Sequence, residues 1–329
     1  IGESNNVILE NLEITGNQVD IGSAIHAPLG SEGKVQLLNS DIHQNMGGCI
    51  YLAYGDMLIS GTTIHNNIHN NADGEIIYLD PNSDLEIYDT VIENNTTGGN
   101  NLINSYNYHS LIMEDVIIRN NTIDGSNLLN IRGDTHSLNR VEITNNTVTT
   151  DGAIIYQMSG GYATINNLVI SDNIAPGPGF ASGNGSGASI TNSIIRTTGD
   201  APALSVGYQY PEFGAVTTVT YSNLTGGEEG VDFYNGNTEE NLNWGDGNID
   251  VDPNFTDPDN GDYTLMETSP CIDTGTIIED MEYCGDAPDM GAYEYITEDC
   301  YECGAELADV NGDGNINILD LVQIANLIL

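Results

Sequence analysis

The sequence predicts an all-β solenoid, in which short strands stack in parallel from one coil of the chain to the next. One observation is a recurring phrase, written TVIENN at residues 90–95, in which a branched apolar residue precedes asparagines. Within each copy, apolar and polar or small residues alternate, as in a strand with one buried face. No helical periodicity separates the copies, and self-similarity at such a period is typical of stacked repeats.

The recurring phrase indicates which residues to expect in the core. Its final asparagine returns after 22 to 28 residues, and an isoleucine stands three positions before it in every copy. The isoleucines are Ile14, Ile42, Ile64, Ile92, Ile118, Ile143 and Ile170, and the asparagines are Asn17, Asn45, Asn67, Asn95, Asn121, Asn146 and Asn173. Because equivalent residues of stacked strands lie about 4.8 Å apart, we expect the isoleucines to form a buried ladder along the axis.

The asparagines allow two interpretations. Asparagine tolerates the left-handed backbone of a sharp corner, its side chain bonds nearby backbone groups, and stacked copies can bond one another along the axis. The pattern Asn-Asn-Thr at residues 94–96, 120–122 and 145–147 also matches the acceptor pattern for N-linked sugars. We favour the corner-building interpretation, which predicts that Asn67, Asn95, Asn121 and Asn146 lie above one another at a turn.

Each period contains two further strand-like runs, so the sequence predicts three strands per coil. One run follows a glycine, as in GCIYLAY at residues 48–54 and GAIIYQM at residues 152–158, and it repeatedly contains tyrosine. If Tyr51, Tyr78 and Tyr156 point outward from a flat sheet, their rings are candidates to stack on sugars. Tyrosine is also an ordinary residue of exposed strands, and the sequence leaves both interpretations open.

From residue 7 to residue 231, these coils resemble the pectate-lyase-like family of parallel β-helix proteins. The resemblance implies a right-handed, single-stranded parallel β-helix with three strands in each coil of 22–28 residues. Residues 247–275 and 286–295, with DPNF, SPC and DMGAYEY, resemble the ending of many secreted bacterial β-helix proteins. We therefore assign residues 1–231 to coils, residues 232–296 to closing coils and a cap, and residues 297–308 to a linker.

Residues 309–329 carry the strongest chemical motif, DVNGDGNINILD, followed by an apolar run that predicts a short helix. Its oxygen-bearing positions have the spacing of a calcium-binding loop, with Gly314 where the loop must turn sharply. The expected Ca²⁺ ligands are Asp309, Asn311, Asp313, Asn315, Asn317 and Asp320. The segment resembles half of a type I dockerin, which implies cohesin recognition. However, Ile318 and Leu319 replace the small hydroxyl residues of that family and argue against a cohesin partner.

Composition excludes several classes of partner. Five Lys and Arg stand against 49 Asp and Glu, a formal net charge of −44, so the chain lacks the basic surface of a nucleic-acid-binding protein. No apolar run approaches the length of a membrane span. The chain begins at Ile1 without an initiator methionine, and we expect a mature or truncated extracellular product.

The cysteines are consistent with an oxidising compartment. Cys271, Cys284, Cys300 and Cys303 crowd the last third of the chain, where Cys271 could pair with Cys284 and Cys300 with Cys303. For the closely spaced Cys300 and Cys303, a local disulfide and free thiols are both open. Cys49 lies in an apolar run and is expected to be a buried thiol.

The sequence contains no paired-carboxylate motif of the kind that glycoside hydrolases on this fold use. Arg132, Asp134 and His136 lie close together and form the candidate catalytic cluster. Our principal hypothesis is a secreted or cell-surface solenoid that acts in adhesion, as a scaffold or in polysaccharide binding. It includes self-association into filaments through the coil ends or the C-terminal helix. The alternative is a carbohydrate-active enzyme on the same fold, either a polysaccharide lyase or a glycoside hydrolase.

Overall fold

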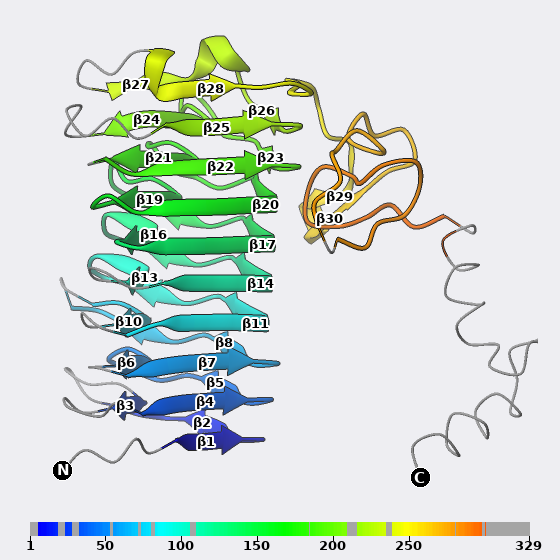
Figure 1. Cartoon of the computed structure of the whole chain (residues 1–329). Helices are drawn as coiled ribbons and strands as arrows, with labels where there is room; N and C mark the ends of the chain where they lie inside the picture. Colours follow the sequence, from blue (N-terminus) through cyan, green and yellow to red (C-terminus); the bar gives the residue numbers. More distant parts are fainter. Residues whose placement is uncertain are drawn as a thin grey trace, which may run out of the picture.

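The computed structural model shows a column of stacked coils with a smaller unit beside it (Figure 1). It describes residues 6–18, 24–27, 33–52, 55–71, 74–79, 83–105, 110–183, 185–208, 216–234, 239–279, 281–297 and 300. Within that part of the chain, the strands form three parallel sheets and one antiparallel pair. The predicted all-β parallel solenoid is therefore confirmed.

The first sheet contains the longest strands. Its main path runs through β1 (Val7–Glu10), β4 (Lys34–Leu38), β7 (Asp56–Ser60), β11 (Leu85–Glu93), β14 (Leu111–Arg119), β17 (Thr135–Thr144), β20 (Tyr162–Ser171), β22 (Gly187–Thr191), β25 (Thr217–Thr220) and β28 (Leu242–Trp244). Shorter strands extend it: β2 (Glu13–Thr15), β5 (Asp41–His43), β8 (Thr63–His65), β23 (Ile194–Ile195) and β26 (Asn223–Leu224). The long strand β14 bends at Asp115, whose φ of 55° is left-handed, and so contributes to two faces of its coil.

The other two parallel sheets complete each coil. The second sheet consists of β3 (Ile25–Ala27), β6 (Ile50–Leu52), β10 (Ile77–Leu79), β13 (Asn101–Ser105), β16 (Asn127–Arg132), β19 (Ile155–Met158), β21 (Phe180–Gly183), β24 (Leu204–Tyr208) and β27 (Asp232–Phe233). The third consists of β9 (Ile68–His69), β12 (Thr96–Thr97), β15 (Thr122–Ile123) and β18 (Thr147–Val148). In the middle of the column, the chain therefore passes through all three sheets in every turn.

The isoleucines of the recurring phrase lie one above another in the core. Register pairs Ile64 with Ile92, Ile92 with Ile118, and Ile118 with Ile143. These residues and Ile170 are 0% exposed. Burying one such side chain contributes roughly 1.5–3 kcal/mol, so a repeated small gain stabilises the whole column.

At the corner that follows the recurring strand, two consecutive residues have different roles. The first, represented by Asn94 and Asn120, has left-handed backbone with φ of 55° and 56°. The second is buried, and its side chain accepts the backbone N–H of the equivalent residue in the preceding coil: Asn95 N–H donates to Asn121 Oδ1 at 2.9 Å. Further contacts of this kind join Asn45, Asn67, Asn95, Asn121, Asn146 and Asn173 into one ladder. The Asn-Asn-Thr pattern therefore follows from the corner geometry.

The segment after the last coil lies beside the column and not over its end (Figure 1). Strands β27 and β28 continue the stack, with the short 3₁₀ helices η2 (Glu228–Gly230) and η4 (Glu239–Asn241) nearby in sequence. Residues 251–297, called the side module below, contain η5 (Pro258–Asn260) and the antiparallel strands β29 (Phe255–Asp257) and β30 (Asp262–Leu265). Strands β27 and β28 thus extend the column, and the side module, which falls in the segment assigned above to closing coils and a cap, lies laterally against it.

The side module attaches to the stack through apolar and polar contacts. Val169 and Ile194 point outward from the first sheet, yet both are buried in one cluster with module residues that include Met290. Around this cluster, Asn192 Oδ1 accepts the Thr276 backbone N–H at 2.8 Å. More polar contacts join Tyr293 to Glu142 at 2.6 Å, Tyr263 to Asp172 at 2.9 Å and Asn167 to the Gly291 carbonyl at 2.9 Å.

The predicted cysteine pairing is wrong. Cys284 forms a disulfide with Cys300, and their Cα atoms lie 5.6 Å apart. Cys271 is a buried thiol in the cluster between module and stack, where burial raises its pKa. Cys49 is buried as expected, while Cys303 lies outside the described residues.

The predicted calcium loop and helix, residues 309–329, also lie outside the described residues. In the part of the chain that the structure describes, no helix is long and apolar enough to cross a membrane.

Candidate functional site

The outer face of the second sheet is hollowed into a groove, which in the described part of the chain is lined by four successive coils. Register places Asn104, Asn130, Tyr156 and Ala181 one above another on β13, β16, β19 and β21. The groove has a volume of about 560 Å³. The lining also includes residues that precede these strands in the chain, namely Asn100, Ser126, Asp151, Gly152 and Pro178. Because equivalent positions recur from coil to coil, the groove follows the axis of the column.

Two rows of amides form the polar half of the groove. In one row, Asn130 Nδ2 donates to Asn104 Oδ1 at 3.2 Å, and Asn104 Nδ2 donates to the Glu75 carboxylate at 2.9 Å. In the other row, Asn127 Nδ2 donates to Asn101 Oδ1 at 3.4 Å. A primary amide has two N–H donors and a carbonyl oxygen with two lone pairs. The bonds along the rows therefore orient the amides without using their full hydrogen-bonding capacity.

An apolar patch forms the other half of the groove. Ala153, Tyr156, Met158 and Ala181 pack together as a small buried cluster, and Tyr156 is 8% exposed. The patch lies on the β19 and β21 coils, directly after the amide rows on the β13 and β16 coils. A ligand with hydroxyl groups and C–H faces matches both halves.

The groove contains one member of the predicted catalytic cluster. Arg132 lines the groove, and its Nε donates to Asn130 Oδ1 at 3.4 Å. His136 is 3% exposed and stands in register with the buried Leu111 and Ala163, so it faces the core. Burial lowers the pKa of His136 to about 4. Arg132 and His136 thus face opposite sides of the coil wall, and with the exposed Asp134 they form no common reaction centre.

The three predicted sugar-binding tyrosines have different surroundings. Tyr156 lines the groove. Tyr51 stacks on His26 with ring centroids 4.9 Å apart and on Tyr78 with ring centroids 5.1 Å apart. Because both faces of the Tyr51 ring are covered by neighbouring rings, neither face is available for stacking on a sugar.

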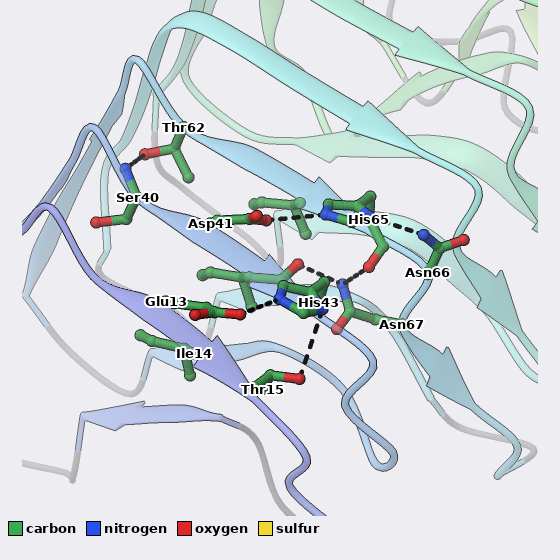
Figure 2. A network of polar contacts seen from close by, with 12 residues as sticks. Glu13, Ile14, Thr15, Ser40, Asp41, His43, Thr62, His65, Asn66 and Asn67 are labelled. Atoms are coloured by element: carbon green, nitrogen blue, oxygen red, sulfur yellow. Dashed lines mark hydrogen bonds and ion pairs between the residues drawn. The ribbon is translucent and has the colours of Figure 1, made fainter.

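A second polar cluster lies on the first coils (Figure 2). His43 Nε2 lies 3.0 Å from Glu13 Oε1, and His65 Nε2 lies 2.9 Å from Asp41 Oδ1. The two imidazoles stack with centroids 5.0 Å apart. Each histidine thus contacts a carboxylate of the preceding coil, which ties neighbouring coils together. Among the described residues, no group of three His, Cys, Asp or Glu side chains has a geometry that holds a metal ion.

The amide rows were not predicted as a site, although a signal for them exists. Asn101 and Asn104 stand three residues apart, and Asn127 and Asn130 repeat that spacing one coil later. These asparagines lie within the strand that follows the glycine, where apolar residues prevail in other coils. Polar residues at equivalent outward positions of adjacent coils are the pattern that identifies this face.

The comparisons with known proteins agree with the fold. No protein-family model matches the chain, and no curated protein matches it. Among solved structures, the crystal structure of pectate lyase Pel9A is similar, with a TM-score of 0.55 and 15% sequence identity over 88% of this chain and 88% of that chain. The chain therefore has a pectate-lyase-like parallel β-helix fold. At this identity, the likeness concerns the fold alone.

Proposed function

We propose that this chain binds an extracellular polysaccharide in the groove of the second sheet. The observation that carries the proposal is the joining of two amide rows to an apolar patch inside one groove. Amides donate to and accept from sugar hydroxyls, and apolar side chains cover the C–H faces of sugar rings. The pectate-lyase-like fold supports the proposal only by analogy, because one fold hosts many functions.

The charge of the chain favours an uncharged polymer. A formal net charge of −44 repels polyanions such as polyuronates, most strongly at low ionic strength. Arg132 offers one positive contact in the groove, but Asp151 belongs to the same lining. We therefore expect neutral polysaccharides to bind more tightly than polyuronates, and the difference to shrink when salt is added.

Affinity electrophoresis followed by calorimetry on a panel of neutral and acidic polysaccharides tests the proposal. Replacing both Asn104 and Asn130 by alanine should weaken binding about tenfold or more, since each net hydrogen bond contributes about 1 kcal/mol. Asn139→Ala is the matched control, because this half-buried asparagine lies on the first sheet, outside the groove lining. The groove is not the binding site if no polysaccharide of the panel binds, or if Asn139→Ala loses as much affinity as the double variant.

Arg132 in the groove favours a second candidate function, that of a polysaccharide lyase. A lyase needs a group that removes a proton next to a carboxylate, and it forms an unsaturated product. Incubating the chain with polyuronates while recording absorbance of such products separates the candidates. Turnover that Arg132→Ala abolishes would replace binding by catalysis, whereas polymers that bind without product support binding alone.

The proposal places the protein outside the cell or at its surface, as a scaffold or adhesion protein. The disulfide between Cys284 and Cys300 supports this location, because disulfides persist in oxidising compartments. The acidic composition supports it as well, since strong net charge favours solubility. Microscopy of the producing cells with an antibody to the chain, before and after permeabilisation, tests the location.

We also propose that residues 309–320 bind Ca²⁺ and that the following apolar run joins copies of the chain. The ligand spacing from Asp309 to Asp320 supports calcium binding, and such binding orders a loop. Calorimetry with Ca²⁺ should give one binding event that Asp313→Ala removes. Sedimentation with Ca²⁺ or chelator then shows whether filaments form, and unchanged monomers in Ca²⁺ would refute the assembly.

A further inference from the structure

We infer that the core of the column binds internal water around Gln157, at the corner where the second sheet is followed by the first. Gln157 lies on β19 in register with the core residue Ile131 of the coil before and with Ser182 of the coil after, so its side chain faces the core. It is 0% exposed, and among the described residues neither its Nε2 nor its Oε1 has a hydrogen-bond partner.

The hydrogen-bonding capacity of Gln157 points to a polar ligand. A primary amide has two N–H donors and a carbonyl oxygen that accepts, and the burial of such a group without a partner is costly. Buried polar groups in proteins are nearly always bonded, either by another protein group or by ordered water. Since the protein supplies no partner to either atom of the Gln157 amide, water is the ligand that satisfies both the donors and the acceptor.

The corner has room for water because small residues face Gln157. Ser182 Oγ lies 3.2 Å from Thr217 Oγ1, so a second-sheet residue of one coil meets a first-sheet residue of the next coil across this corner. By the same geometry and register, Gln157 faces Ala188. Alanine occupies this first-sheet position in two successive coils, whereas the lower coils fill it with the larger side chains of Met57, Leu85 and Leu111.

Hydroxyl groups at the same corner supply further partners. Ser186 precedes Ala188 in the corner segment, is 5% exposed, and has an Oγ without a hydrogen-bond partner among the described residues. The hydroxyls of Ser182 and Thr217 are 0% exposed and keep bonding capacity beyond their mutual contact. A buried water makes about three hydrogen bonds, which the Gln157 amide and these hydroxyls together provide. Because all of these groups are uncharged, the site suits water and not an ion.

Magnetic relaxation dispersion of ¹⁷O in solutions of the full chain tests the site, because it detects water held inside a protein. Gln157→Leu should lower the dispersion amplitude by about one water molecule or more, since it removes the amide that holds the water. Ile131→Leu is the matched control, an apolar change in register one coil lower that should leave the amplitude unchanged. A crystal structure of the wild type should show water within hydrogen-bond distance of the Gln157 amide.

Urea unfolding separates a hydrated amide from a dry one. If the amide is dry, Gln157→Leu removes a buried unpaired group and raises the unfolding midpoint. If it is hydrated, the variant leaves the neighbouring hydroxyls without water and lowers the midpoint. Ala188→Leu keeps the amide and fills the space, so it should lower the dispersion amplitude even if Gln157→Leu does not fold. An unchanged amplitude in Gln157→Leu, a raised midpoint, or a wild-type crystal structure without water at the amide overturns the site.

Discussion

The column of coils and the side module are stabilised in different ways. The column repeats one set of contacts, in which isoleucine lies on isoleucine and, from Asn45 to Asn173, asparagine accepts from asparagine at the corner after the recurring strand. The module uses contacts that occur once, such as Asp289, whose carboxylate accepts the backbone N–H groups of Asp273 at 2.7 Å and Tyr295 at 2.6 Å. A repeated contact leaves a period in the sequence, whereas a unique contact leaves no local signal.

The two regions also differ in their buried ionisable groups. The column buries the imidazole of His136, which is favoured in its neutral form and has a pKa lowered to about 4. The module half-buries the carboxyl of Glu294, and burial together with the nearby Asp289 raises its pKa to about 7. Acid should therefore weaken the column, whereas alkali should weaken the module.

The largest expected effect is on the corner ladder. Asn121→Ala removes the acceptor for Asn95 and the donor to the Ile92 carbonyl, both in buried surroundings. Each buried group left without a partner costs about 1–3 kcal/mol, so we expect a loss of about 3–6 kcal/mol in urea unfolding. Asn120→Gly is the control, because glycine adopts the left-handed backbone at little cost. Equal losses of unfolding free energy in both variants would contradict the different roles of the two corner residues.

The next effect concerns attachment of the module. Ile194→Ala should cost about 2–5 kcal/mol and should loosen the module from the stack, because Ile194 is 0% exposed beneath it. Hydrogen exchange should rise in residues 251–297 while the core strands stay protected. Ile117→Ala changes a half-exposed outward residue three coils away in the same column, and it should leave the module attached. Fast exchange throughout the core strands of Ile194→Ala would refute this separation.

A smaller effect is the acid sensitivity of the column. The folded pKa of His136 lies near 4, below the unfolded value of 6.5, so the unfolded chain binds the proton more tightly. The stabilisation is complete above pH 6.5 and is lost as pH falls toward 4, by at most about 3 kcal/mol. Unfolding midpoints of the wild type and of His136→Phe, measured between pH 4 and pH 7, should converge at low pH. Parallel curves would exclude His136 as the cause.

The smallest expected effect is the alkali sensitivity of the module. The folded pKa of Glu294, about 7, lies above its unfolded value of 4.5, so the folded module holds the proton more tightly. Its contribution is complete below pH 4.5 and is lost as pH rises through 7. Hydrogen exchange in residues 251–297 should be slower at pH 5 than at pH 8 after correction for intrinsic rates. Glu294→Gln should reduce the difference in exchange rate between pH 5 and pH 8. If the difference is unchanged, another titrating group causes it.

The column could be predicted because its structure is periodic. Ile92 and Asn95 occupy the same places as Ile118 and Asn121, so the spacing alone indicates both the strand and the corner. The sequence of the side module resembles an ending of β-helix proteins, but it does not indicate where the module lies relative to the column. Nothing in its own sequence shows that Met290 packs on Ile194, since this contact depends on an outward face of the column some hundred residues earlier.

The candidate site was predicted only in part, for two physical reasons. Arg132 and His136 are four residues apart, a spacing that would share one face of a continuous strand, but the corner at Gly133, with φ of 96°, separates β16 from β17 and places them on opposite sides of the wall. The groove itself arises from outward residues of four coils, and outward positions carry no hydrophobic period. The cysteine pairing failed because Cys271 is needed as an apolar residue where the module meets the stack.

The corner ladder has a consequence for how such a molecule can change over generations. Asn95 relates to Asn121 as Asn121 relates to Asn146, with Oδ1 of the later residue 2.9 Å from the backbone nitrogen of the earlier one. A deletion that removes residues 96–121 therefore brings Asn95 against Asn146, and the joint is chemically the same as before. Gain or loss of whole coils by unequal recombination thus changes the length of the groove, while the contacts between neighbouring coils stay the same.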